Sequence, residues 1–171
     1  MDKVIGGSIA IALIVGALVL MTFAWRARSR RASLIGHWPL LESDSVLSFE
    51  VFYVATTHHD RPLERVALRG FGYRSFAQIH IHRDGLALAL TSGDTLVMPS
   101  TSLRRIHTEQ VAIDKAVERD GLVAFDWLSR DIGSGSVELT TFVRLRDAAQ
   151  QKELIAASSA LVPTTTKEDV A

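Results

Sequence analysis

AQIHIHRDGLALALTSGDTLVM, residues 77–98, carries a regular β pattern. Its first six residues alternate apolar and polar side chains, the period-two pattern of a half-buried strand. Asp84-Gly85 is a strong hairpin signal, and the Ser-Gly-Asp of residues 92–94 marks a second turn. Residues 77–98 therefore predict three short antiparallel strands joined by two tight turns.

Further strands are predicted on both sides of this stretch. The segment FEVFYVAT (residues 49–56) is rich in β-branched and aromatic residues, which favour strands. The remaining predicted strands cover residues 103–107, 122–128 and 137–145. Residues 60–70 favour a short helix, with Asp60 as its cap, Pro62 in its first turn and Gly70 at its end. A strand is the alternative for this segment.

A different period appears near the C-terminus. Asp147 stands three residues before Gln150, a spacing that resembles a helix-capping box. Strong helix formers follow over residues 150–161, and one face is apolar, which predicts an amphipathic helix. The positions on that face are Leu154, Ala157, Ser158 and Leu161, with Ile155 flanking them. Pro163 ends the helix, and residues 162–171 are predicted to be a disordered tail.

Together these patterns predict about seven short antiparallel strands followed by one helix. A partly open barrel of seven strands would expose apolar core at one end, and a terminal helix with one apolar stripe can cover it. The expected fold is therefore a mainly-β, pleckstrin-homology-like (PH-like) domain over residues 49–161, capped by its C-terminal helix.

The N-terminal region has a different composition. VIGGSIAIALIVGALVLMTFAW, residues 4–25, contains no charged residue, and as a helix it would be about 33 Å long, enough to cross the hydrocarbon core of a bilayer. Residues 1–3 form a short, neutral flank, the run is too long for a signal peptide, and arginines follow it instead of a cleavage site. We therefore expect an uncleaved transmembrane helix.

Four arginines follow this span: Arg26, Arg28, Arg30 and Arg31. Because Lys3 alone precedes the span, the positive-inside rule predicts a single-pass plasma-membrane protein whose C-terminal domain is cytoplasmic. The arginines are candidate contacts for anionic lipid headgroups, each worth about 1 kcal/mol near the surface, or they only set the topology. Residues 26–48 are expected to be a linker, with Trp38 at the membrane interface.

Small residues recur every four positions within the span, at Ser8, Ala12 and Gly16. This spacing places them on one helix face, where small side chains allow a second helix to approach closely. Self-association through the span is one interpretation. The other is that small residues are common in any membrane helix.

Charge is unevenly distributed along the chain. The formal net charge of the chain is zero, but residues 32–171 contain 14 Lys and Arg against 18 Asp and Glu, a formal charge of −4. An acidic domain argues against nucleic acid as a partner. The sequence contains no cysteine, which excludes disulfides, thiolate nucleophiles and cysteine metal sites.

Motifs typical of enzymes are missing from the sequence. It contains neither G-x-S-x-G nor a phosphate-binding loop, so we expect no enzyme activity, no catalytic residues and no cofactor. His80 and His82 share a strand face at a spacing that could bind zinc, with His58, His59 or His107 as a further ligand. The apolar residues of that strand lie on its other face, so we expect solvent-facing histidines and no metal site.

Several short motifs occur in a fixed order along the chain: YVATT (53–57), LERV (63–66), GFGYR (70–74), RDGL (83–86), LVMP (96–99) with LR (103–104), VERDGLV (117–123), and the strand that contains Trp127. With the terminal helix, they resemble actinobacterial single-span membrane proteins that carry a bacterial PH-like domain, over about residues 1–161. The resemblance implies a membrane helix followed by a PH-like domain. It implies neither an activity nor catalytic residues.

Loops between barrel strands are where PH-like folds usually bind, which points to residues 57–62, 70–75 and 113–120. The candidate binding residues are His58, His59, Arg61, Tyr73, Arg74, Lys115 and Arg119. Residues 57–62 lack the Lys/Arg-rich pattern of PH domains that bind phosphoinositides. We expect the domain to recruit or scaffold a protein partner at the membrane. Binding of anionic lipid headgroups is the alternative, and an accessory role in a transport or export system is a weaker one.

Overall fold

The computed structural model describes residues 13–23, 35–66, 68, 70–109, 111–112, 115–116, 121–133 and 135–163. They belong to two compact units, residues 1–34 and residues 35–171, which we describe separately.

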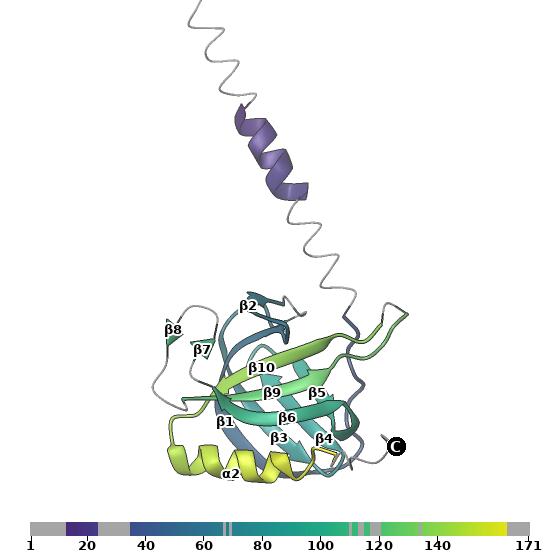
Figure 1. Ribbon diagram of the computed structural model, residues 1–171, viewed down its shortest axis with the longest axis vertical. Helices are drawn as coiled ribbons and strands as arrows, with labels where there is room; N and C mark the ends of the chain where they lie inside the picture. The colour runs from purple at the N-terminus through teal and green to yellow at the C-terminus, as the bar shows by residue number, and fades with distance from the viewer. Residues whose placement is uncertain are drawn as a thin grey trace, which may run out of the picture. The chain divides into compact units, whose positions relative to one another are not determined.

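In the first unit, residues 13–23 form an α-helix (Figure 1). Its large apolar side chains are exposed: Leu13, Ile14, Val15, Leu18, Val19, Leu20, Met21 and Phe23. Among the residues that the structure describes, no helix has the length and apolarity needed to cross a membrane. Much of the predicted span, including Ser8 and Ala12, and the four arginines after it lie outside the described residues.

The second unit is built around one curved antiparallel sheet (Figure 1). Its strands are β1 (Ser45–His58), β2 (Arg61–Arg65), β3 (Ser75–His82), β4 (Gly85–Leu90), β5 (Thr95–Pro99), β6 (Leu103–Glu109), β9 (Leu122–Leu128) and β10 (Glu138–Arg144). Their order is β5-β4-β3-β1-β10-β9-β6, and β2 pairs with β1 off this path. A 3₁₀ turn, η1 (Ser100–Ser102), follows β5, and β7 (Val111–Ala112) pairs with β8 (Lys115–Ala116) in a separate small sheet.

The three strands predicted from residues 77–98 are confirmed as β3, β4 and β5, paired in succession. The mainly-β architecture, with an open sheet and a C-terminal helix, agrees with the expected PH-like fold. The helix predicted over residues 60–70 is wrong, because Arg61–Arg65 forms β2. There His58 pairs with Arg61 and Thr57 with Arg65, so pairing with β1 outweighs the local helix signals.

The domain begins earlier than predicted. Ile35 is buried in the main core, and Trp38 packs against that core while its indole N–H donates to the carbonyl of Leu128 over 2.9 Å. The expected linker, residues 26–48, is therefore too long at its C-terminal end, because residues 35–48 belong to the domain and the last four of them already form the start of β1. Trp38 is held by the domain's own apolar surface instead of serving as a free interfacial anchor.

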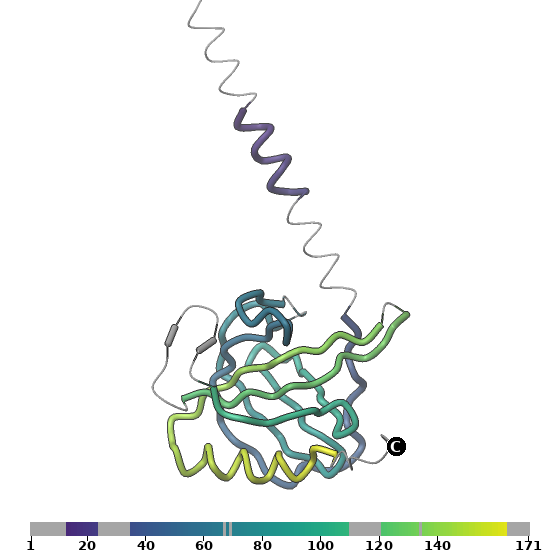
Figure 2. The backbone as a smooth tube through the Cα atoms, viewed as in Figure 1, coloured from purple at the N-terminus to yellow at the C-terminus, as the bar shows by residue number. Residues whose placement is uncertain are grey.

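The last element, α2 (Ala148–Ser159), lies across one end of the sheet (Figures 1 and 2). The predicted cap is confirmed, since a carboxylate oxygen of Asp147 accepts a hydrogen bond from the Ala149 N–H over 2.8 Å. Leu154 is fully buried in the main core, and Ile155 and Leu161 pack against it. The amphipathic stripe therefore covers the barrel end as the sequence predicted.

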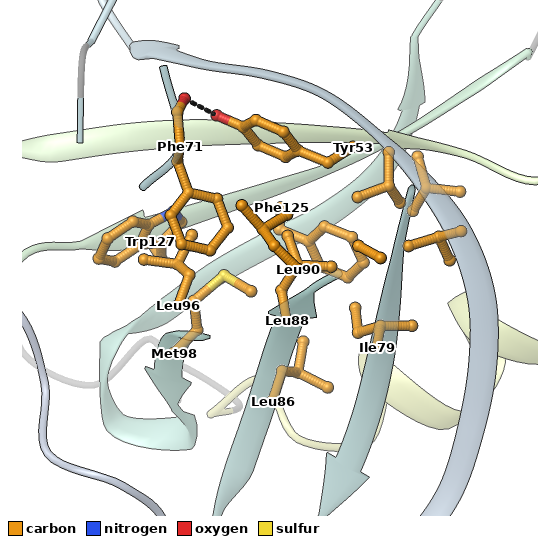
Figure 3. Close-up of a cluster of buried hydrophobic side chains, with 14 of the residues drawn as sticks. Tyr53, Phe71, Ile79, Leu86, Leu88, Leu90, Leu96, Met98, Phe125 and Trp127 are labelled. Atoms are coloured by element: carbon orange, nitrogen blue, oxygen red, sulfur yellow. Dashed lines mark hydrogen bonds between the residues drawn. The ribbon is translucent and has the colours of Figure 1, made fainter. Parts of the chain in front are cut away.

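A buried chain of polar side chains crosses the main core. The indole N–H of Trp127 donates to Thr141 Oγ1 over 3.0 Å, and this hydroxyl lies 3.0 Å from that of Thr56. The Tyr53 hydroxyl lies 3.2 Å from Thr56 Oγ1 and donates to the Phe71 carbonyl over 3.0 Å (Figure 3). Each polar atom of the chain has a partner, so these groups are buried without a large desolvation cost.

The hairpin turn between β3 and β4 also holds the start of the domain. Asp84 accepts hydrogen bonds from the Ser43 hydroxyl and, over 3.2 Å, from the Glu42 N–H. The hydrogen bond from Ser43 holds the pKa of Asp84 below its usual value. The carboxylate therefore adds stability above its unfolded-state pKa of about 3.9, and this stability is lost as the pH falls through the lower folded-state pKa.

We predict that Asp84→Asn lowers the unfolding midpoint at pH 7 and that the difference from wild type shrinks as the pH falls below about 4, the unfolded-state pKa, and through the lower folded-state pKa. Urea unfolding at a series of pH values measures this difference. Glu153→Gln, at an exposed position of α2, is the control for a general charge effect. A gap between Asp84→Asn and wild type that is independent of pH would contradict the assignment.

Candidate functional site

The sheet carries a second buried surface on its outer side. Along β9, Phe125 and Trp127 point into the main core, whereas Leu122 and Ala124 belong to a separate cluster with Phe142 of β10. Asp126 alternates with Phe125 and Trp127 and therefore lies on the same outer side as Ala124. A charged residue thus stands at the centre of an otherwise apolar strand.

A pocket of about 310 Å³ opens on this outer side. The described residues that line it are His59, Pro62, Leu63, His107, Glu109, Asp126, Thr140 and Phe142. We call it the outer pocket. It joins β6, β9 and β10 to the turn between β1 and β2, so one of its walls comes from the first of the predicted binding loops.

A bulge in β1 brings that turn over the pocket. The register of β1 against β10 shifts between Tyr53 and Ala55. Before the shift Tyr53 faces the main core, and after it Val54 and Ala55 both join the outer cluster. One extra residue therefore reverses the alternation of faces. As a result His59, which follows the strand, reaches Asp126 on the outer side.

Asp126 is 2% exposed and is the most deeply buried carboxylate among the described residues. Its Oδ1 accepts a hydrogen bond of 2.6 Å from the Thr140 hydroxyl, its direct cross-strand partner. His59 Nδ1 lies 3.4 Å from the same oxygen and 3.2 Å from Thr140 Oγ1. A buried carboxylate is stable only when hydrogen bonds and charge partners replace its water, so these contacts define a polar site inside an apolar wall.

His107 completes the polar side of the outer pocket. Its Nδ1 lies 3.6 Å from Asp126 Oδ2, and its Nε2 lies 3.2 Å from Glu109 Oε1. Because a carboxylate oxygen can only accept, Nε2 carries the hydrogen of that contact. The Nδ1 atom is buried and has no hydrogen-bond partner among the described residues.

Comparison with sequence models of protein families identifies the family of this chain. The sequence model of a family described as bacterial PH domain-like matches residues 37–159. This chain belongs to the bacterial PH domain-like family. A search of curated proteins returned no match. PH-like domains are generally binding modules, which agrees with a domain whose outer pocket lies beside an inter-strand loop.

The PH-like domain brings few of the predicted loop residues together. His58 ends β1, and His59 lines the outer pocket. Arg61 lies outside the pocket lining and is paired with Glu64 over 2.7 Å. Tyr73 is 86% exposed in the connection before β3.

Three candidates remain, of which the structure describes the side chain of one. Arg74 is exposed in the same connection as Tyr73 and is not part of the lining. Arg119 and the side chain of Lys115 lie outside the described residues.

The histidine pair considered for zinc lies elsewhere. His80 and His82 are half-buried on β3, and His82 Nδ1 donates to the Ser43 carbonyl over 2.6 Å. Within the described part of the chain, no group of three or more His, Asp or Glu side chains could hold a metal ion.

The sequence interpretation missed Asp126, Thr140 and Glu109, and considered His107 only as a zinc ligand. The signal that could have found the site is the lone aspartate in LVAFDWL, residues 122–128, where every other side chain is apolar. A charge at the centre of a buried strand requires polar partners from neighbouring strands.

We predict that Thr140→Val destabilises the domain by about 1.5–3 kcal/mol, because it removes the hydrogen bond to a buried carboxylate while keeping the side-chain shape. Equilibrium unfolding measures the loss. Thr95→Val, at an exposed strand position of β5, is the matched control and should change stability by less than about 0.5 kcal/mol. Equal effects of the two substitutions would contradict the role given to Thr140.

Proposed function

We propose that this chain is a non-enzymatic, single-pass membrane protein whose PH-like domain recruits or scaffolds a protein partner at the cytoplasmic face of the plasma membrane. The family supports a binding module. The outer pocket and its rim support a macromolecular ligand, because Leu63 lines the pocket and is also 71% exposed. A large apolar side chain held at the mouth of a polar pocket is typical of a recognition surface.

The membrane tether is supported by the uncharged sequence of residues 4–25 and by the described helix within it. Residues 13–23 expose their large apolar side chains, and a helix that is apolar on all sides needs an apolar environment. The arginines after residue 25 support the cytoplasmic side for the domain. An alkaline phosphatase that is active when fused to the C-terminus would overturn this orientation.

The alternative function, binding of anionic lipid headgroups, has less support. The described lining of the outer pocket contains two carboxylates, Asp126 and Glu109, and neither lysine nor arginine. A phosphate group would be repelled there. Vesicle binding by the domain that rises with anionic lipid and weakens with salt would favour the lipid alternative.

The proposal predicts site-specific crosslinking in cells. A photo-crosslinking amino acid at Leu63 should capture one specific protein, identified by mass spectrometry, because this side chain stands at the pocket rim. The matched control is Ile132, which is 53% exposed in the β9–β10 turn and outside the pocket lining. Identical capture from both positions, or none from Leu63, would contradict recruitment through this face.

A further inference from the structure

We propose that the outer pocket binds the ε-ammonium group of a lysine side chain presented by the protein partner. This inference rests on the proposed function, since it names the chemistry by which that partner is held. Its starting point is a pair of pocket atoms: Asp126 Oδ2 lies 3.6 Å from His107 Nδ1, and this buried nitrogen has no hydrogen-bond partner among the described residues.

His107 Nδ1 is an acceptor when the ring is neutral and its single hydrogen lies on Nε2. The Nε2 atom, 3.2 Å from Glu109 Oε1, carries the hydrogen, so in the neutral ring Nδ1 keeps its lone pair. That lone pair lies 3.6 Å from Asp126 Oδ2, too far for a hydrogen bond between the two groups. An N–H donor placed beside both atoms would satisfy both at once.

The carboxylate of Asp126 favours a donor that carries a positive charge. It is 2% exposed, and the one hydrogen bond described for it, from Thr140, uses Oδ1. A carboxylate can accept about four hydrogen bonds, so Oδ2 can accept from a ligand while Oδ1 accepts from Thr140. Glu109 adds a second negative charge at the edge of the pocket. An anionic ligand is therefore disfavoured and a cationic one is favoured.

Arg105 is a cation of the sheet that could pair with Asp126 in place of a ligand. It lies opposite Asp126 in the β6–β9 register, but its side chain is exposed and outside the pocket lining. The structure describes no ion pair within 4.0 Å between these two residues. Among the described residues, the charge partners of Asp126 within 4.0 Å are therefore two histidines, His59 and His107, which neutralise the carboxylate only when they are protonated.

The shape of the site favours ammonium over guanidinium. A guanidinium pairs best with both oxygens of one carboxylate, and Oδ1 of Asp126 is already occupied by Thr140 and approached by His59. An ammonium is compact and has three donors that can point to separate acceptors. Pro62, Leu63 and Phe142 form the apolar wall along which the methylene stem of a lysine can pack.

The test is an NMR titration of the full-length chain in detergent micelles, with isotope-labelled histidine. Nα-acetyl-lysine methylamide is the probe, and Nα-acetyl-norleucine methylamide, which has an apolar side chain and no ammonium, is its control. We expect the ring signals of His59 and His107 to shift saturably with the lysine probe alone. The signal of His80, on the outer face of β3, serves as an internal control and should not move.

Substitutions make the assignment specific. Asp126→Asn should weaken binding of the lysine probe by at least about tenfold, because it removes the buried charge. If Asp126→Asn fails to fold, Glu109→Gln, at a half-exposed side chain, takes its place and should weaken binding severalfold. Arg105→Gln should leave binding unchanged or tighten it, since it removes a like charge.

Three results would overturn the proposal: no saturable shift with the lysine probe, an equal response to norleucine, or unchanged affinity in Asp126→Asn and Glu109→Gln. Butylammonium tests whether the ammonium group comes from a free amine or from a protein. If butylammonium binds and the lysine amide does not, the pocket is a site for free amines, and the proposal that a partner's lysine binds there is wrong. If the lysine probe binds but Leu63 captures no protein, recruitment is wrong and the pocket assignment stands. If Leu63 captures a partner but the lysine probe does not bind, recruitment stands and the pocket assignment is wrong.

Discussion

The fold of the domain depends on β1, which pairs with both β3 and β10 and contributes side chains to both buried clusters. Residues Ser45–Tyr53 of β1 pair with β3, and Phe52–His58 pair with β10. The bulge between Tyr53 and Ala55 lies where the strand passes from one partner to the other. Because it inserts one residue, it changes which side chains face the core, and it bends the strand so that the sheet curves. The bulge helps to shape both the main core and the outer pocket, and a second register shift, between Leu103 and Arg105 of β6, precedes His107, which lines the pocket.

The buried hydrogen-bond chain shows how the bulge is held in place. Tyr53 precedes the bulge and Thr56 follows it, and both hydroxyl groups point into the main core, where they meet Trp127 and Thr141. Burial raises the pKa of Tyr53, so its hydroxyl stays protonated and remains a donor across the physiological range. A different register would leave these polar groups unpaired in an apolar interior, which is costly. The polar chain therefore favours one register of β1 over its neighbours.

Much of the fold could be predicted because its signals are local. Asp84-Gly85 and residues 92–94 specify tight turns through their own chemistry, and Asp147 caps α2 through a contact with Ala149 two residues away. Strand β2 could not be predicted in the same way. Its sequence carries helix-start signals, and these compete with pairing to the adjacent end of β1, which makes it a strand.

The outer pocket was beyond local patterns for a different reason, because its residues come from strands that are far apart in the sequence. Asp126 and Thr140 are fourteen residues apart, and His59 is eighty-one residues from Thr140, so their proximity depends on sheet order and on the bulge. The prediction that binding residues lie in the inter-strand loops included His59, which lines the pocket. It also included Arg61 and Tyr73, which are exposed outside the pocket lining. The alternation of side chains along a strand does predict which side of β9 carries Asp126. That the outer side is buried there is a property of the assembled sheet.

A pocket that satisfies one side chain of a partner provides modest affinity. A tether would make such affinity sufficient, because holding the domain at the membrane raises the local concentration of partners held there too. In the proposed arrangement the N-terminal helix determines where the domain acts, and the outer pocket determines which partner the domain binds. The selection by the outer pocket rests on the claim that His107 Nδ1 does not donate to Asp126 Oδ2.

The measurement that tests this claim most directly is the tautomer of His107 in the ligand-free protein, read from its two ring nitrogen-15 shifts at pH 7. The account predicts a neutral ring with its hydrogen on Nε2, directed at Glu109, and an unprotonated Nδ1 facing Asp126. A hydrogen on Nδ1 would contradict it, because His107 would then supply the donor that Asp126 lacks.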